Sequence, residues 1–442
     1  MTTLIRGGRL IDGTGAPAVD ADVLLDDDEI VAVGPGLDDS SADDGSVDVI
    51  DASGLTVMPG LIDAHVHCTF DDVASNDELF HHRSAATAAL VAGFNVQKML
   101  RAGVTSVMDP DTIFEIGPAL RDAVDAGVVE GPRIATGVSA LLTSVGGTAG
   151  RMIPDQGGAG YAQVVTTTAE MVAETRRHIK HGADWIKIHA TGSIPRHRGE
   201  LLVWTADELR AVCETAHALD TPVAAHCRSA ESTRVAAEAG VDLILHASFM
   251  DDTALEAVVE HGASLCPTFT FLANLADHGH LVGAGVGMKD IFRGEIEATG
   301  EMMRRAHDAG VPLLTGSESG FALTPYGHWH AREIELFVEV LGLSPLEAIR
   351  CATERGGIAM RMPGEVGVIR VGARADLLVV DGMPDRDVSV LSDRSRFRHV
   401  ISRGTPVDLE RPWPERESIH GERVSVWASE VLTRERTIGA ES

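Results

Sequence analysis

Short apolar segments alternate with amphipathic segments through most of the chain, and this pattern predicts its fold. Several amphipathic segments open on Ser, Thr or Asp and close on Gly, which is typical of helices. The predicted strands are LIDAHVH, VTSVMD, RIATGVSAL, DWIKIHAT, PVAAHCRS, VDLILHAS, ASLCPTF and VPLLTGSE. The predicted helices include 117–127, 165–181, 205–219, 231–239, 252–261, 290–309 and 330–341. Eight such units in about 300 residues predict an α/β TIM (β/α)8 barrel, although a doubly wound open sheet uses the same alternation.

A different pattern, short alternating strands joined by Gly, Asp and Ser turns, occupies both ends of the chain. The N-terminal strands are TLIRGGRLID, ADVLLDDDEIVAVG and DVIDASGLTV, and the C-terminal strands are GEVGVIRVG, ADLLVVDG and RHVISRGTPV. We expect the two ends to pair into one small β-sandwich domain, made of residues 1–57 and 364–442. The barrel domain would then cover residues 58–363.

Composition narrows the class of protein. The chain has 442 residues, 44% of them hydrophobic, and a net charge of −29, which argues against nucleic-acid and anionic-membrane partners because phosphate contacts need clustered Arg and Lys. No apolar run approaches the roughly 18 residues of a membrane span, and the start lacks the apolar stretch of a signal peptide, so we expect a cytoplasmic location. The five cysteines include no C-x-x-C pair, which argues against a disulfide framework and a thiolate zinc site.

Ionisable side chains occur where the predicted strands end. His65 and His67 are separated by one residue, so on a strand both point to the same face. Four more strands end on such groups: Lys187, His226, His246 and Glu318. Each alone could be a hydrogen-bonded or ion-paired core residue. A barrel, however, brings these strand ends together, and burying so many polar groups is costly unless something binds them.

A metal cluster would satisfy these groups. Neutral imidazoles and carboxylates suit Zn²⁺, with Mn²⁺, Co²⁺ or Fe²⁺ as alternatives. A protonated lysine cannot ligate a cation, so Lys187 must be neutral or covalently converted. Reaction of Lys187 with CO₂ would give a carbamate whose two oxygens could bridge two metals.

The segments RLIDGTG, VMPGLIDAHVH, GADWIKIHATG, AAHCRS, LILHAS, GLSPLEAIRCAT and GVIRVGARADLLVVD together resemble the metal-dependent amidohydrolase superfamily. Within it the chain is similar to the branch with imidazolonepropionase-like, prolidase-like and ochratoxin-hydrolysing enzymes. The resemblance implies a barrel with a small β-sandwich, and a homo-oligomer. It also implies that His65, His67 and a carboxylated Lys187 hold one metal and that Lys187, His226 and His246 hold the second. The acid at the end of strand eight would bind the first metal and shuttle a proton.

The chain departs from the family pattern at three positions. Glu318, in GSESG, stands where the family usually has Asp, and Asp109 is the fallback acid. Thr148, in VGGT, and Arg228, in HCRS, stand where prolidase-like relatives often carry His and Tyr. Arg228 could bind a substrate carboxylate bidentately or form a structural salt bridge. The residues we expect to contact substrate are Arg228, Thr148, His189 and His330, with His328 as a further pocket candidate.

We therefore expect an enzyme that hydrolyses a C–N bond of a small amide, N-acyl amino acid, carbamate or urea-type substrate through a metal-bound hydroxide, with Glu318 moving the proton. The departures weaken the case for ordinary dipeptide hydrolysis. Two other functions stay open. A mononuclear deaminase or dechlorinase of heteroaromatic rings is disfavoured by Lys187, and a scaffold protein derived from the barrel is disfavoured by the retained ligands.

Overall fold

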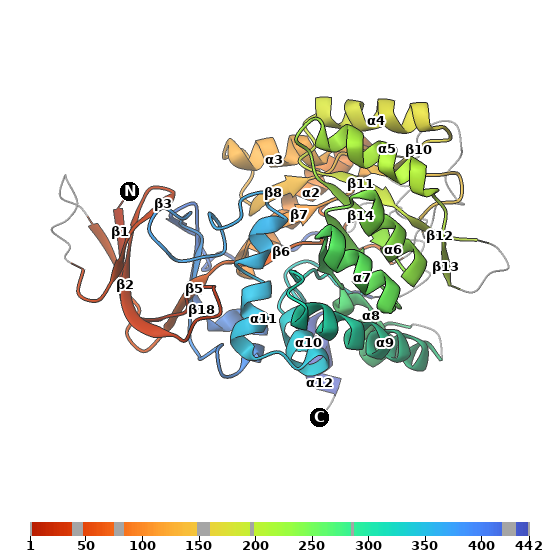
Figure 1. Ribbon diagram of the computed structural model, residues 1–442. Coiled ribbons are helices and arrows are strands. Elements are labelled where there is room, and N and C mark those ends of the chain that lie inside the picture. The colour runs from red at the N-terminus through yellow and green to blue at the C-terminus, as the bar shows by residue number, and fades with distance from the viewer. Residues whose placement is uncertain are drawn as a thin grey trace.

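The computed structural model describes residues 2–37, 47–74, 84–147, 160–194, 199–283, 287–417 and 430–440. Thr148 lies outside them. In Figure 1 a sheet built from the red N-terminal and blue C-terminal parts of the chain lies at the left, and helices surround parallel strands at the right.

The parallel strands fall into two sheets of three and six strands. The first sheet consists of β6 (Leu61–Asp63), β7 (Val104–Asp109) and β8 (Arg133–Thr136). The second consists of β10 (Ala162–Val164), β9 (Ala140–Leu142), β11 (Ile186–His189), β14 (Val223–Cys227), β15 (Leu243–His246) and β16 (Ser264–Cys266). A separate hairpin joins β12 (Thr191–Ser193) to β13 (Glu200–Leu202).

Backbone hydrogen bonds connect the two parallel sheets at both edges. Asp184 N donates to Thr136 O over 2.7 Å, which joins β8 to the segment before β11. On the other side Leu314 N donates to Leu265 O and Ala64 N to Thr315 O, each over 2.9 Å. The eighth predicted strand is thus present as a short segment, with one bridge at Leu313, between β16 and β6.

The predicted helices are confirmed with small shifts at their ends. They are α3 (Gly117–Asp125), α4 (Thr168–Lys180), α5 (Ala206–His217), α6 (Ala230–Ala239), α7 (Asp252–His261), α9 (Met288–Asp308) and α10 (Arg332–Leu341). The caps set the boundaries: Thr167 forms a capping box with Glu170, so α4 begins at residue 168 rather than 165. The other α-helices are α2 (Ala85–Arg101), α8 (Phe269–His278), α11 (Pro345–Cys351) and α12 (Arg434–Ala440).

Both chain ends contribute to one eight-stranded sheet, which we call the end sheet. Its N-terminal strands are β1 (Thr2–Leu10), β2 (Val19–Asp26), β3 (Glu29–Gly34), β4 (Val47–Asp51) and β5 (Thr56–Pro59). Its C-terminal strands are β17 (Leu377–Val380), β18 (Phe397–Ser402) and β19 (Thr405–Pro406), and β5 pairs with β17. The end sheet has its own buried core. Its folding into a sandwich and the proposed domain boundaries stay predictions.

One predicted strand is wrong. Residues 364–372 form turns because three glycines in the segment, Gly364, Gly367 and Gly372, have φ of 75°, 74° and 83°, which no extended strand accommodates. Val368 and Ile369 of this segment still pack into the core of the end sheet.

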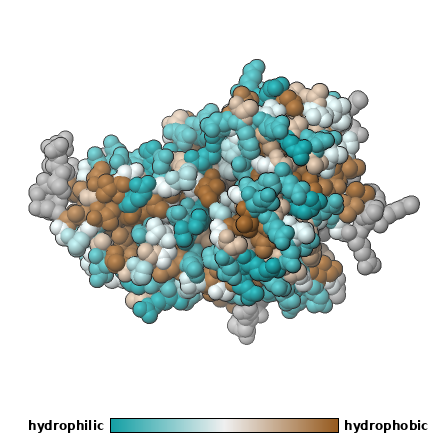
Figure 2. Space-filling view, viewed as in Figure 1, coloured by the Kyte–Doolittle hydropathy of each residue, from teal (hydrophilic) through white to brown (hydrophobic). Residues whose placement is uncertain are grey.

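The surface mixes hydrophilic and hydrophobic residues, with hydrophobic ones gathered over the end sheet at the left of Figure 2. Val19, Val31 and Val49 of that sheet are exposed. Among the described helices, none combines the length and apolar character needed to cross a bilayer.

Candidate metal centre

Two backbone hydrogen bonds fix the first pair of histidines. His65 and His67 follow directly after β6, and both side chains are buried. Glu318 N donates to His65 O and His67 N donates to Ser319 O, each over 2.7 Å. The ends of strands one and eight therefore hold each other, so the two histidines and Glu318 lie on the same side of the barrel.

The other predicted ligands lie in three neighbouring strands. Lys187 lies in β11, His226 in β14 and His246 at the end of β15, and all three are buried. The ring centroids of His226 and His246 are 4.6 Å apart, and those of His246 and His65 are 5.3 Å apart. The imidazoles predicted from separate strands thus form one continuous cluster.

Two sets of side chains in this cluster could each hold a metal ion. One consists of His65, His246 and Glu318, and the other of His65, His67 and Asp111, with ligand atoms within 4.8 Å of one another in each set. Neither set includes Lys187 or His226. His226 Nε2 instead donates to Glu200 Oε2 over 2.8 Å.

Several polar atoms of the cluster are buried without a hydrogen-bond partner among the described residues. They include His65 Nδ1, His67 Nδ1, His246 Nε2 and Asp111 Oδ1. A buried polar group without a partner costs about 1–3 kcal/mol, so their concentration at one place indicates a ligand that is bound there. Imidazole nitrogens and carboxylate oxygens are the donor set of Zn²⁺ and similar divalent metals.

Burial shifts the pKa values of the clustered side chains, and for His65, His246 and Lys187 it favours the neutral form. Burial lowers the pKa of Lys187, and burial together with neighbouring cations lowers the pKa of His65 and His246 well below their ordinary value. Burial raises the pKa of Glu318. Neutral imidazoles and a neutral amine are the forms that bind metal or react with CO₂.

The backbone is strained at the same place. His246, Thr268 and Glu318 have φ of 68°, 53° and 55°, in the left-handed region that side chains rarely adopt. Such strain clusters at functional sites, where the surrounding structure enforces it.

The sequence comparison identifies the family. A profile of the amidohydrolase family matches residues 56–407, which is most of the chain. The chain belongs to the amidohydrolase family. It is therefore a hydrolase that acts on C–N bonds of small amides, in a family that is generally metal-dependent.

Individual relatives agree with this assignment. The amidohydrolase is 26% identical to the ochratoxinase of Aspergillus niger over 91% of this chain and 86% of that protein. It is also 26% identical to the imidazolonepropionase of Micrococcus luteus, over 84% and 90% of the two chains. A crystal structure of a prolidase complexed with N-methylphosphonate-L-proline has a TM-score of 0.81 and 30% identity, covering 92% of this chain and 99% of that chain. These relatives confirm a TIM-barrel fold of mixed α/β content.

Three of the residues predicted to contact substrate in the amidohydrolase, Arg228, His189 and His330, are each paired with a protein carboxylate. Arg228 forms a salt bridge to Glu295, in which Nη2 donates to both carboxylate oxygens, at 2.7 and 2.8 Å. His189 Nε2 donates to Asp111 Oδ2 over 2.9 Å. His330 Nε2 accepts from Gly327 N over 3.0 Å while Nδ1 donates to Asp63 Oδ2 over 2.7 Å, so both ring nitrogens have protein partners. Substrate binding by these residues stays a prediction.

The sequence interpretation missed two acids of the site, Asp111 and Glu200. Asp111 lies two residues beyond β7, in DPDT, so the rule that found Lys187 at the end of a strand finds Asp111 when it is extended into the following turn. Glu200, in β13, contacts His226 of β14. No spacing in the sequence indicates that contact.

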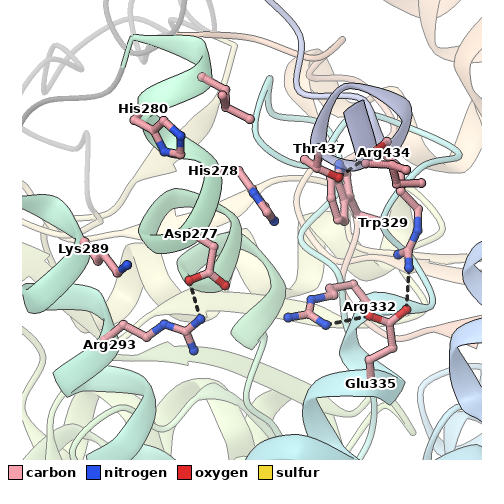
Figure 3. Close-up of a pocket in the computed structure, with 12 residues that line it drawn as sticks. Asp277, His278, His280, Lys289, Arg293, Trp329, Arg332, Glu335, Arg434 and Thr437 are labelled. Atoms are coloured by element: carbon pink, nitrogen blue, oxygen red, sulfur yellow. Dashed lines mark hydrogen bonds and ion pairs between the residues drawn. The ribbon is translucent and has the colours of Figure 1, made fainter. Parts of the chain in front are cut away.

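A cavity of about 550 Å³ lies outside the cluster of predicted ligands. Figure 3 shows its lining side chains, which come mainly from α8, α9, α10 and α12, with Arg293 paired to Asp277 and both Arg332 and Arg434 paired to Glu335. None of the six predicted ligands lines it.

Proposed function

We propose that this amidohydrolase uses two divalent metal ions, with Zn²⁺ the first choice and Mn²⁺, Co²⁺ or Fe²⁺ as alternatives, together with a carbamate on Lys187. The substrates are small amides, N-acyl amino acids, carbamates or ureas. The observation that carries the proposal is the concentration, at the carboxyl ends of the barrel strands, of buried imidazole and carboxylate atoms that have no hydrogen-bond partner among the described residues.

In this proposal His65, His67, Glu318 and the carbamate of Lys187 hold the first metal. The same carbamate, His226 and His246 hold the second. The contact between His226 and Glu200 supports this, because Nε2 donates its proton to the carboxylate and the lone pair of Nδ1 is left for a metal. A carboxylate that orients a ligating histidine is common around metal centres.

Bound divalent metals would polarise the scissile carbonyl and lower the pKa of water, to about 7 for zinc. Glu318 supplies the proton transfer. Its Oε1 lies 4.0 Å from His246 Nε2, and burial raises the pKa of its carboxyl, which makes the carboxylate a better proton acceptor. Glu318 takes a proton from the attacking water as the C–O bond forms and delivers it to the leaving nitrogen as the C–N bond breaks. The products are a carboxylic or carbamic acid and an amine.

Aromatic side chains that pack around His67 support substrates with an apolar part. Phe70 stacks on His67 with ring centroids 4.1 Å apart, and Phe321 meets the same imidazole edge-on at 5.7 Å. Tyr161 lies 5.9 Å from Phe70. The prolidase relative was crystallised with a small proline derivative, which supports N-acyl amino acids as one class to screen.

The test is metal content per chain for the wild type and Lys187→Ala, each produced with zinc or manganese and bicarbonate. The expected result is close to two metals in the wild type and fewer in the variant, with loss of amide hydrolysis. Lys180→Ala is the matched control, because Lys180 is exposed on α4 and should leave metal content unchanged. About one metal in both the wild type and Lys187→Ala would contradict the proposal and favour a mononuclear deaminase or dechlorinase.

A further inference from the structure

A carboxylate that the proposed ligand set does not use lies inside the metal cluster. Asp111 follows β7 by two residues and has 1% relative exposure. One of its two oxygens is hydrogen-bonded, because Oδ2 accepts from His189 Nε2 over 2.9 Å. His189 is itself held in place by stacking on His226, with centroids 4.9 Å apart and an interplanar angle of 11°.

The second carboxylate oxygen of Asp111, Oδ1, lies near His65 and His67. This oxygen lies 3.0 Å from His67 Nδ1. Neither atom has a hydrogen-bond partner among the described residues, so the two are close without being aligned for a hydrogen bond. Two atoms that ligate one cation at about 2.1 Å lie roughly 3.0 to 3.4 Å apart, because the angle between the two bonds is about 90° in octahedral and about 109° in tetrahedral sites.

We propose that Asp111 is a further ligand of the metal centre, on the metal held by His65 and His67, and that His189 is the positioning residue that orients it. The inference rests on the proposed function, because it assumes that a metal binds there. Ligating carboxylates are usually hydrogen-bonded through their second oxygen, as Asp111 is through His189. The added carboxylate gives the His65 and His67 side of the centre an anionic ligand besides Glu318.

An ion pair with Lys187 does not explain the position of Asp111. The described part of the chain contains no ion pair between these two side chains, and Oδ1 is without a hydrogen-bond partner there. Oδ1 lies 3.0 Å from His67 Nδ1 without a hydrogen bond to it, so a metal cation held by both atoms would satisfy both. His65 and His67, whose Nδ1 atoms are without a hydrogen-bond partner among the described residues, belong to the same set of possible ligands as Asp111.

The experiment compares metal retention in wild type, Asp111→Asn, His189→Phe and Asp22→Asn during dialysis against a graded series of chelator concentrations. Asp111→Asn keeps the shape and removes the anionic ligand. His189→Phe keeps a ring against His226 and removes the N–H donor to Asp111. Asp22→Asn is the matched control, because Asp22 is a buried carboxylate of the end sheet, accepts from Gly7 N and Leu37 N through its two oxygens and lies outside both ligand sets. Cobalt-loaded proteins are compared by visible absorption, which reports the ligand set independently of activity.

We expect Asp111→Asn to lose one metal at a chelator concentration at least tenfold below that needed for the wild type, with a changed cobalt spectrum. For His189→Phe we expect a loss of affinity of about 10- to 100-fold. Asp22→Asn should behave as the wild type. If Asp111→Asn keeps two metals with wild-type affinity and spectrum, the inference is wrong while the proposed function stands. If the wild type binds no metal, both are wrong. If Asp111→Asn does not fold, His189→Phe decides, because wild-type retention in that variant contradicts the positioning role.

Discussion

The hydroxyl of Thr268 determines which ring nitrogen of His246 is available to bind a metal. Thr268 Oγ1 donates its proton to Pro267 O over 2.7 Å and is also hydrogen-bonded to His246 Nδ1. Since the hydroxyl proton is already donated, Oγ1 accepts from Nδ1–H, which fixes the tautomer of the imidazole. Its Nε2 then carries a lone pair, and this atom has no hydrogen-bond partner among the described residues.

We therefore predict that Thr268→Val weakens metal binding. Valine has the same shape but no oxygen, so His246 Nδ1–H loses its acceptor and the ring is free to rotate or change tautomer. The expected loss of metal affinity is about 10- to 100-fold, measured by chelator competition. Thr268→Ser, which keeps the hydroxyl, should retain most of the affinity. Equal affinity in the valine variant and the wild type would contradict this role for Thr268.

The candidate site residues that could be predicted from the sequence lie at strand ends, whereas those that were missed act through contacts between distant segments. His65, His67, Lys187, His226 and His246 could be predicted because each lies in or directly after an apolar strand, and one rule about strand ends collects them. Thr268, Glu200 and Asp111 act through contacts made in three dimensions. His189, for example, contacts Asp111 across 78 positions of the chain, and no local pattern encodes that pairing.

At the scale of elements, strand length and strand number were harder to predict than helix position. Helix ends follow local rules, since Thr205 and Ser229 form capping boxes and Gly240 ends α6 with a left-handed φ of 97°. The predicted third strand instead divides into β8, which pairs with β7, and β9, which pairs with β11. Gly137 lies between them, where a Cβ would come within 1.9 Å of Pro110 O. That close approach is a property of the packed barrel and not of the segment.

The start of α8 gives a prediction about pH. Glu333 accepts hydrogen bonds from Phe269 N and Thr270 N, both over 2.8 Å, and so caps this helix from α10. Burial outweighs those bonds and raises the pKa of Glu333 from its ordinary 4.5 to about 8. Between these values the native state holds a proton that the unfolded chain has released, so the free energy of unfolding falls as pH rises, by up to about 1.4 kcal/mol per pH unit.

Glu333→Gln removes this titration. From pH 5.5 to pH 7.5 the wild type should lose about 2 to 3 kcal/mol more of its free energy of unfolding than the variant does. Urea unfolding of both proteins at the two pH values measures the difference, and contributions of other groups cancel in the comparison. The same pH dependence in both proteins would show that Glu333 is ionised in the native state throughout this range.

At the scale of the whole molecule, the end sheet is tied to the barrel on the side opposite the metal cluster. Arg133 begins β8, at the amino end of the barrel strands. Its guanidinium pairs with Asp28, in the turn between β2 and β3, and donates from Nε to Asp376 Oδ2 over 2.6 Å. Asp376 is buried and also accepts Arg403 N over 2.8 Å. One arginine of the barrel therefore joins the N-terminal and C-terminal parts of the end sheet.

We predict that Arg133→Met destabilises the protein without affecting the metal centre. The substitution leaves Asp376 buried without its cation, and removing one partner of a buried pair costs about 3–5 kcal/mol. Adding Asp376→Asn to the same chain should recover part of that loss, because the uncompensated charge is gone. Urea unfolding measures the stability, and metal content per chain should stay at the wild-type value in both variants, since the strand ends that bear the ligands are far along the barrel from Arg133. Loss of metal at unchanged stability would contradict this separation of roles, because it would mean that the end sheet acts on the metal centre rather than on the fold.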